Sequence, residues 1–308
     1  MKKHNLYNFG TIRRIPCPHC SHLCSLKADY CIKCGEPLPK IAVNRTEATS
    51  LSLSEEEFNE SNYIKLIEEV IRKEIPRKAK INNKELGYKK RDGKIVGLSL
   101  PYCRLKSLPP LITELKFLKA LFLNQNFLST IPKQLIHMPS LEILGLDHNK
   151  IEEIPNFLVK LKNLRILSLN SNNLQELPKG ISELTNLRVL LLKRNNLKSI
   201  PKTLIFLERL EKLNLRINNI ESIPSSLGYF ATLKELNLSS NNLKELPPTI
   251  GNMKSLKILN LSNNKLTNLP SSISDLSSLE YLNLKGNYWL TTPKSLESLE
   301  RKGLKILK

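Results

Sequence analysis

Five of the six cysteines lie between residues 17 and 34, and four of these form two pairs with metal-ligand spacing. Cys17 and Cys20 make one C-x-x-C pair, and Cys31 and Cys34 make a second pair after a gap of ten residues. Each pair places two thiolates on one side of a tight turn, and two such turns complete the tetrahedral sulfur shell that zinc prefers. The sequence therefore predicts one structural zinc ion, because a closed shell leaves no coordination site for catalysis.

Three further donors lie close to this set. We interpret His19, His22 and Cys24 as bystanders, with Cys24 the best replacement ligand if one of the four is wrong. The two pairs resemble the short zinc ribbons found at the ends of archaeal and other prokaryotic proteins, although the ten-residue gap is short for that family. Residues 1–36 are thus predicted to be a zinc ribbon, and residues 37–53, with two prolines followed by small polar residues, a linker.

A repeat of 23 residues occupies most of the remaining chain. The unit reads Leu164-x-x-Leu167-x-Leu169-x-x-Asn172-x-Leu174-x-x-Leu177-Pro178, and nine copies fit between residues 95 and 301. The alternating leucines predict a short strand, and the apolar residues after the proline suit a helical or extended turn. One unit cannot bury its own leucines, so the units must stack and need a cap at each end. Residues 302–308 are predicted to be the C-terminal cap strand.

The asparagine of each unit is predicted to be structural. It sits where the strand turns inward, and its amide can satisfy backbone groups of its own turn and of the neighbouring one. In the first unit Cys103 takes this position, and we interpret it as a small, inert, buried residue. The ladder consists of Asn126, Asn149, Asn172, Asn195, Asn218, Asn241, Asn264 and Asn287.

On these residues the chain resembles leucine-rich repeat proteins of the 23-residue type. It looks most similar to the Ras-pathway leucine-rich scaffolds and to the plant intracellular Ras-group-related repeat proteins. The resemblance implies an α/β solenoid, curved, with a parallel sheet on its concave face. It also implies protein binding as the usual activity, with a small GTPase or its regulator as one candidate partner.

Residues 54–94 are predicted to cover the front of the solenoid. Ser54 and Glu57 form a capping box that opens a helix, and Asp92-Gly93 is the turn of a later hairpin. The helix should pack near the first repeat, and binding a partner is its alternative role. Its apolar stripe consists of Phe58, Ile64, Ile67, Val70, Ile71 and Ile75.

The residues that flank the inner leucines of each strand should face outward on the concave side. Repeats two to five present apolar side chains there, and repeats five and six add basic ones. An apolar strip bordered by cations suits an acidic protein surface with a hydrophobic anchor, while a merely solvated face is the competing interpretation. The candidate partner-binding residues are Phe122, Ile143, Asp147, His148, Ile166, Val189, Leu191, Lys193, Arg194, Lys212, Arg216 and Ile217.

Charge and composition narrow the classes of function. The 308 residues include 48 Lys and Arg against 28 Asp and Glu, a net charge of +20 that is spread along the chain. Such an excess favours acidic partners without identifying nucleic acid. We find none of the common phosphate-loop, nucleophile-elbow or zinc-protease motifs. No apolar run is long enough for a membrane helix, and the polar start is unlike a signal peptide.

We therefore expect a cytoplasmic, non-catalytic scaffold that binds a protein partner through its concave face, with the zinc ribbon as an accessory module. We expect no small-molecule substrate and no membrane insertion. The alternative is a nucleic-acid-associated protein, in which the ribbon and the basic segments between Arg77 and Arg91 contact phosphates.

Overall fold

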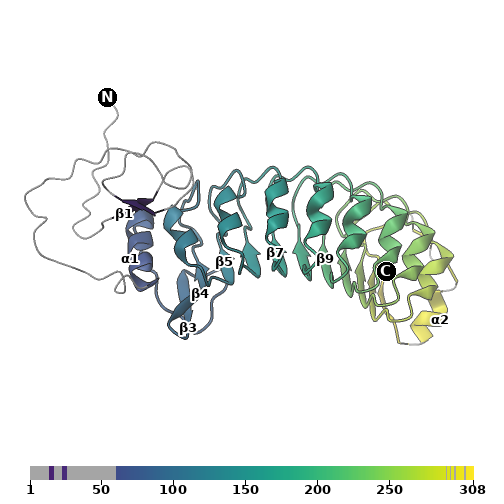
Figure 1. Cartoon of the computed structure of the whole chain (residues 1–308). Coiled ribbons are helices and arrows are strands. Elements are labelled where there is room, and N and C mark those ends of the chain that lie inside the picture. Colours follow the sequence, from purple (N-terminus) through teal and green to yellow (C-terminus); the bar gives the residue numbers. More distant parts are fainter. Residues whose placement is uncertain are drawn as a thin grey trace, which may run out of the picture.

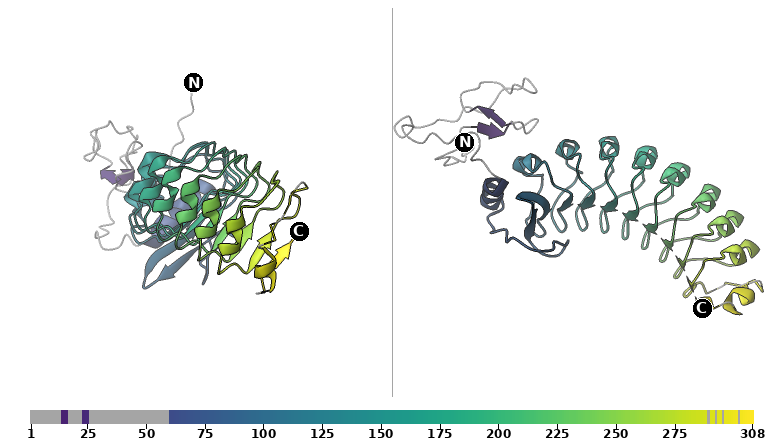
Figure 2. Two further views of the ribbon diagram at one scale, coloured as in Figure 1. Left: turned by 90° about the vertical axis from the view of Figure 1, so that its right-hand side faces the viewer. Right: turned by 60° about the horizontal axis from the view of Figure 1, so that its bottom comes forward.

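The structure is a computed structural model that describes residues 14–16, 23–25 and 60–308, except for residues 289, 292, 295 and 302. Residues 60–94 form a cap, and from residue 95 onward the chain forms an arc of stacked repeat units (Figure 1). Figure 2 shows strands along the inner side of the arc and short helices along its outer side. The predicted curved solenoid with a parallel sheet on its concave face is confirmed.

One sheet of 11 strands lines the concave side, ordered along the chain from β3 to β13. Neighbouring repeat strands pair in parallel and in register, so Leu144, Leu167 and Leu190 stand side by side. These leucines are fully buried and belong to one continuous core. The strands are β3 (Gly87–Arg91), β4 (Lys94–Ser99), β5 (Ala120–Phe122), β6 (Ile143–Gly145), β7 (Ile166–Ser168), β8 (Val189–Leu191), β9 (Lys212–Asn214), β10 (Glu235–Asn237), β11 (Ile258–Asn260), β12 (Tyr281–Asn283) and β13 (Lys305–Leu307).

The segment after each of the repeat prolines from Pro109 to Pro270 forms a short 3-10 helix on the convex side, which decides between the helical and extended alternatives, and an α-helix follows Pro293. Pro178 shows why, because its φ of −65° presets the entry into η5. The N–H of Leu184 then donates to the carbonyl of Ile181, and this i to i+3 bond keeps the turn tight. The helices are η2 (Pro110–Glu114), η3 (Lys133–His137), η4 (Asn156–Lys160), η5 (Lys179–Glu183), η6 (Lys202–Phe206), η7 (Ser225–Tyr229), η8 (Pro248–Asn252) and η9 (Ser271–Asp275).

Three of these convex helices touch through their backbones. A Cβ atom at Gly228 of η7 would lie 2.1 Å from the carbonyl oxygen of Thr249 in η8. The same relationship recurs one repeat later, where a Cβ at Gly251 would lie 2.2 Å from the carbonyl oxygen of Ser272. Glycine is therefore required at both positions for η7, η8 and η9 to pack this closely.

Helix α1 (Glu60–Ile71) covers the first repeat. Ile64, Ile67, Ile71 and the following Ile75 are buried in the common core. Val70 was expected to share this stripe, but that prediction is wrong, because its side chain is 53% exposed. At 100° per residue Val70 is turned well away from Ile71 around the helix axis. Phe58 and the capping box of Ser54 and Glu57 lie outside the described residues.

The hairpin and the first repeat share a strand. β3 pairs antiparallel with β4 across the Asp92-Gly93 turn, where both residues have positive φ angles, as a type I′ turn requires. β4 also pairs in parallel with β5 as the first strand of the repeats. The front cap is therefore continuous with the solenoid sheet rather than laid against it.

The other end of the solenoid closes with α2 (Leu296–Arg301) and β13. Leu296, Leu299 and Leu304 are buried in the common core. β13 pairs in parallel with β12 and so adds the last strand of the sheet within residues 302–308.

Upstream of α1 the structure describes two short strands, β1 (Arg14–Pro16) and β2 (Leu23–Ser25), which pair antiparallel. Cys24 belongs to β2, where it is paired with Ile15. The four predicted zinc ligands lie outside the described residues, so the zinc ribbon stays a prediction. No helix within the described part of the chain is long and apolar enough to cross a membrane.

Candidate functional site

The ladder asparagines tie each repeat to the one before it. Asn172 donates from Nδ2 to the carbonyls of Leu146 and Leu169, at 3.0 and 3.1 Å, and its Oδ1 accepts from the N–H of Ile151 at 3.0 Å. Two of these three partners belong to the preceding repeat. All eight ladder asparagines are buried and repeat this pattern, which satisfies the backbone groups of the inward turn.

The residue before each ladder asparagine has a left-handed backbone. His148, Arg194 and Ile217 occupy this position, with φ angles of 55°, 59° and 56°. All three come after their strands have ended, since β6, β8 and β9 stop at Gly145, Leu191 and Asn214. The structure therefore places these three predicted binding residues in a row along one edge of the sheet, beside the strands that carry the others.

Asp147 does not belong to the exposed face, and its prediction as a contact residue is corrected. Its side chain is only 6% exposed. Oδ1 accepts hydrogen bonds from Ser168 Oγ at 2.5 Å and from the N–H of Asn170 at 2.8 Å, and Asn83 Nδ2 stands 3.5 Å from Oδ2. The carboxylate of Asp147 therefore links its own repeat to the next repeat and to the segment that contains Asn83.

Asn83 belongs to a connection between α1 and β3 that lies against the front of the concave face. Ser99 Oγ at the end of β4 donates to the carbonyl of Asn82 at 2.7 Å, and the Asn83 amide reaches Asp147 two repeats further on. Ser99 itself is fully buried. The open part of the concave face therefore begins further along the arc than the sequence suggested.

An apolar strip crosses the open part. Ile143, Ile166 and Val189 are paired across β6, β7 and β8 and are all half-buried, as are Phe122 and Leu191 on the same face. Because Ile143, Ile166 and Val189 occupy adjacent strands in register, their side chains form one row about 4.8 Å apart. Phe122 and Leu191 belong to the next row of the same face, where Gly145 and Ser168 lie between them.

Three cations border this strip without a counter-ion. Arg194 and Arg216 are exposed and Lys193 is half-exposed, and none of them has a carboxylate within 4.0 Å among the described residues. Lys212 differs from them, because its ammonium is paired with Glu235 on the next strand. The predicted basic cluster is therefore reduced to three uncompensated charges.

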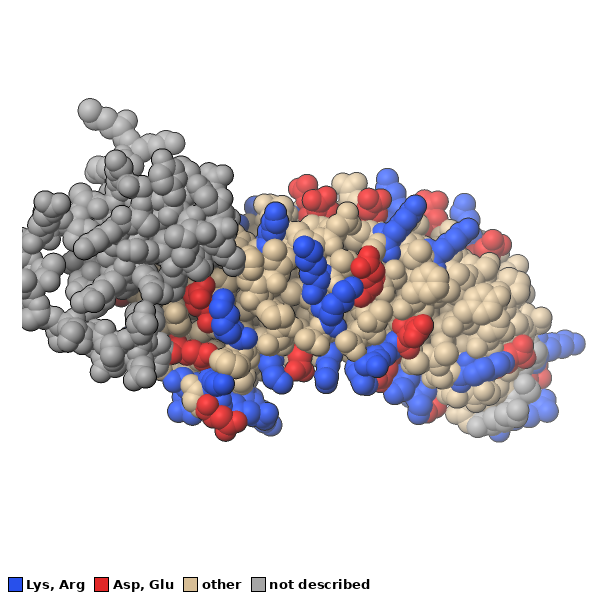
Figure 3. All heavy atoms as spheres, in the orientation of Figure 1, with Lys and Arg blue, Asp and Glu red and all other residues tan. Residues whose placement is uncertain are grey.

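Several cations at the beginnings of the strands are neutralised by a row of ion pairs that the sequence interpretation missed. Glu142 lies between Lys119 and Arg165, at 3.0 and 3.7 Å. Glu211 lies between Arg188 and Lys234, at 2.7 and 2.8 Å, and their hydrogen bonds, Lys234 first, hold the pKa of its carboxyl below the ordinary value. These positions recur every 23 residues, so the repeat itself carried the signal. Figure 3 shows the resulting mixture of blue and red side chains over one side of the arc.

From β9 onward the last residue of each repeat strand is an uncharged asparagine. Asn214, Asn237, Asn260 and Asn283 end consecutive strands, and the Oδ1 of each accepts from the backbone N–H two residues later, at 3.0 to 3.1 Å. Their amides thus stabilise the strand ends. Apolar surface nevertheless continues beyond β9, because Ile258 on β11 is 38% exposed.

The described part of the chain contains neither an activated thiol nor a cluster of metal ligands. Cys103 is buried, and burial raises the pKa of its thiol, so the nucleophilic thiolate is disfavoured. No group of three or more His, Cys, Asp or Glu side chains lies together among the residues that the structure describes.

Comparison with known proteins agrees with this architecture. The leucine rich repeat family model matches residues 95–151, 162–227 and 231–288, and a second model, for two copies of the repeat, matches residues 139–179. No curated protein matches the chain.

Two solved structures show the same kind of repeat. One is the leucine-rich repeat ectodomain of the plant membrane receptor kinase GASSHO1/SCHENGEN3 from Arabidopsis thaliana, in complex with Casparian strip integrity factor 2; it is 36% identical, with a TM-score of 0.59, and covers 66% of this chain. The other is a leucine-rich repeat protein of Leptospira interrogans, 32% identical, with a TM-score of 0.47 and the same 66% coverage. This chain spans 25% of the plant chain and 64% of the bacterial one. On the family match over more than half of its residues, the chain belongs to the leucine-rich repeat family.

Proposed function

We propose that the protein is a non-catalytic scaffold that binds a protein partner on the open part of its concave face. Leucine-rich repeat domains generally mediate protein-protein interaction. The observation that carries the proposal is the row of Ile143, Ile166 and Val189 across adjacent strands, bordered by three cations without counter-ions. Apolar contact supplies binding free energy, and unpaired charge at the border supplies orientation and speed of association.

The partner proposed from this chemistry is an acidic protein surface with an apolar anchor, and a small GTPase or its regulator is one candidate. The plant ectodomain supports a ligand-binding role for such repeats, since it was solved with a bound factor. The proposal includes a cytoplasmic location and a structural zinc ion held by Cys17, Cys20, Cys31 and Cys34. In that arrangement the ribbon is an accessory module and supplies no catalytic chemistry.

The nucleic-acid alternative finds less support in the basic segments between Arg77 and Arg91. Lys78 is paired with Glu85, and Lys90 donates to Ser61 Oγ at 2.6 Å. Contacts of this kind compete with phosphate binding, because each engaged ammonium must first give up a partner.

The proposal is tested by capturing partners from native lysate on the tagged full-length protein, with and without nuclease. Reversing the three border cations, in K193E/R194E/R216E, should abolish capture while the melting temperature stays close to that of the wild type. The matched control is K198E/K244E/K265E, which changes the net charge equally at exposed lysines elsewhere and should capture normally.

Three outcomes would contradict the proposal. Undiminished capture by K193E/R194E/R216E would exclude the concave border as the site. An equal loss of capture in both triple variants would mean that only the net charge of the protein matters, and not the position of these cations. Recovery that disappears after nuclease treatment would favour the nucleic-acid alternative.

A further inference from the structure

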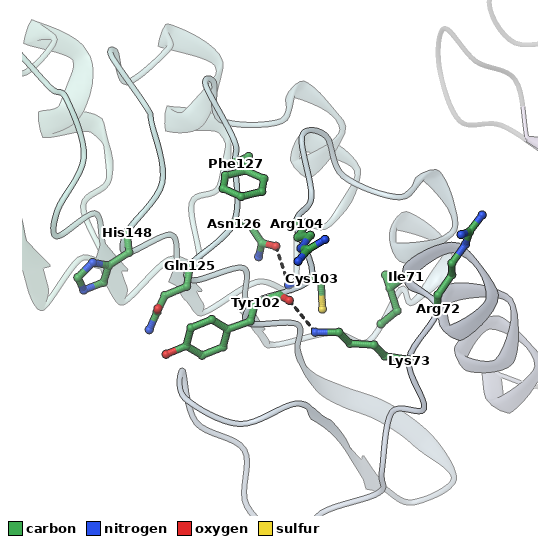
Figure 4. A pocket seen from close by; sticks show the side chains of 10 residues that line it. All are labelled: Ile71, Arg72, Lys73, Tyr102, Cys103, Arg104, Gln125, Asn126, Phe127 and His148. Atoms are coloured by element: carbon green, nitrogen blue, oxygen red, sulfur yellow. Dashed lines mark hydrogen bonds between the residues drawn. The ribbon is translucent and has the colours of Figure 1, made fainter.

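A hollow lies outside the open part of the concave face, where the end of α1 meets the first two repeats (Figure 4). It has a volume of about 730 Å³ and is open to solvent. We call it the α1 notch. Arg72 and Lys73 line it from the end of α1, Tyr102 and Arg104 from the first repeat, and Phe127 from the second. None of the concave-face residues proposed above lines it except His148, at its far side.

The α1 notch is cationic. Arg72 and Arg104 are exposed, and no carboxylate of the described residues stands within 4.0 Å of either. Lys73 donates from Nζ to the carbonyl of Tyr102 at 2.6 Å, which fixes the ammonium in the hollow without neutralising it. No acidic residue of the described chain lines the notch. The positive charges of the notch are therefore not neutralised by the described residues, and their electrostatic potential attracts an anionic partner.

Apolar surface lies beside these charges. Tyr102 is 54% exposed and Phe127 is 47% exposed, so both aromatic rings are open to a ligand. Lys150 adds a further cation, with its Nζ 5.6 Å from the centre of the Phe127 ring. Exposed aromatic rings beside cations accept an acidic ligand that also carries an apolar side chain.

The backbone holds two of the cations in an unusual conformation. Arg72 follows the last residue of α1 and has a φ of 54°. The N–H of Lys73 bonds back to the carbonyl of Glu68 at 3.2 Å, the geometry of a helix end that normally takes glycine. Arg104 has a φ of 55°, and its counterparts in later repeats, Phe127 and Lys150, have no positive φ. Arginine therefore occupies two positions at which glycine would be less strained.

Along the row of equivalent repeat positions, the positive charge beside the notch is separated from the next cation by several repeats. Arg104, Phe127 and Lys150 occupy equivalent positions of successive repeats, and four neutral residues follow before Lys265. A polynucleotide would need a basic track along the arc to neutralise successive phosphates. A short acidic segment needs only the notch itself. The neutral continuation of the row is Asn173, Asn196, Asn219 and Asn242.

We propose that the α1 notch binds a short acidic peptide segment of a partner protein, with one apolar or aromatic side chain of that segment against Tyr102 and Phe127. The carboxylates of the segment face Arg72, Lys73 and Arg104. This surface is separate from the concave strip, so a single partner or two different ones can use both.

The test measures fluorescence anisotropy with the full-length protein and a fluorescein-labelled peptide of alternating Glu and Gly that carries one central Phe. Three further probes are compared with it: the same peptide with Ser for Phe, the same peptide with Lys for Glu, and a single-stranded oligonucleotide of equal length. The Glu and Phe peptide should bind most tightly, and its affinity should fall with added salt.

Two notch variants separate charge from folding. R72E/R104E should weaken binding of the acidic peptide by about tenfold or more, whereas K198E/K244E, with the same change in net charge, should stay within about twofold. R72G/R104G removes both cations and places glycine at two positions with positive φ angles, so the variant should fold normally. Its affinity for the acidic peptide should nevertheless be lower than that of the wild type.

Several results would overturn the inference. These are equal losses in R72E/R104E and K198E/K244E, unchanged binding by R72G/R104G, tightest binding of the oligonucleotide, or no saturable binding of the acidic peptide. K193E/R194E/R216E should bind the peptide normally. A loss in that variant alone would move the peptide to the concave face, so the two sites can fail independently.

Discussion

Asp147 and Ser168 face each other across adjacent repeats, with Ser168 Oγ 2.5 Å from the carboxylate that also receives the N–H of Asn170. We expect D147A to destabilise the protein by about 1–3 kcal/mol, because it leaves buried donors without an acceptor. Urea unfolding measures the loss. D275A, at an exposed aspartate on the convex side, should change stability by less than about 0.5 kcal/mol. Equal stability of D147A and the wild type would mean that the hydrogen bonds to this carboxylate contribute little.

The ladder can be tested at one rung. N172A removes an amide that donates to two buried carbonyls and accepts from one buried N–H, so it should lower the free energy of unfolding by about 1–3 kcal/mol. Its neighbour Asn173 is exposed and supplies the control N173A. If both variants melt at the same temperature, water replaces the asparagine amide without loss.

The convex packing makes a steric prediction. G228A and G251A each place a methyl group about 2 Å from a backbone carbonyl, and the resulting overpacking should cost about 1–3 kcal/mol. G180A meets no atom closer than 3.6 Å and should be neutral or stabilising. Thermal melts of the three variants decide the point, and a destabilised G180A beside unaffected G228A and G251A would contradict it.

Glu211 predicts a pH dependence. Its pKa is lowered by Lys234 and Arg188, so its ion pairs stabilise the folded state above the ordinary carboxyl pKa. This contribution is lost as the pH falls through the lowered pKa, where the folded carboxylate finally takes up a proton. E211Q removes the titrating group, so its stability should fall less than that of the wild type between neutral and acidic pH. Parallel pH profiles from urea unfolding would argue against the pairing.

The zinc prediction has a direct assay. Purified protein should contain about one zinc per chain, and C17S/C34S should abolish it while the circular dichroism of the repeats persists. The control C103S changes a buried cysteine of the solenoid and should keep the metal. Metal retained by C17S/C34S but lost when Cys24 is also replaced would show that the ligand set includes Cys24.

The apolar core and the asparagine ladder were predictable from the repeat, whereas the ion pairs, although equally periodic, were missed. Leu167 and Asn172 follow from the 23-residue interval, because stacking identical units fixes what each position must contact. Asp147 has a partner, Asn83, that no repeat interval relates to it. Lys212 and Glu235 are one interval apart, but the interval alone does not show which neighbouring side chains form ion pairs. Asn83 in particular comes from a segment outside the repeat, and no spacing places it against the third repeat. The outward position of Val70 similarly reflects how α1 is rotated against the core, which is a tertiary property.

The basic residues Lys89 to Arg91 lie on β3, and this position suggests a role other than phosphate contact. β3 is the outermost strand of the sheet. Residues 76–78 bridge to its outer edge at Tyr88, and the edge from Lys89 to Arg91 lies beyond that bridge, where an extended chain can approach. Lys89, Lys90 and Arg91 occupy most of that strand, and Lys305 stands on the opposite outer strand. A long sheet with an accessible strand edge at each end is a template for end-to-end polymerisation, and like charges at both edges repel a second copy. Neutralising them should convert a discrete solenoid into one that grows into fibres.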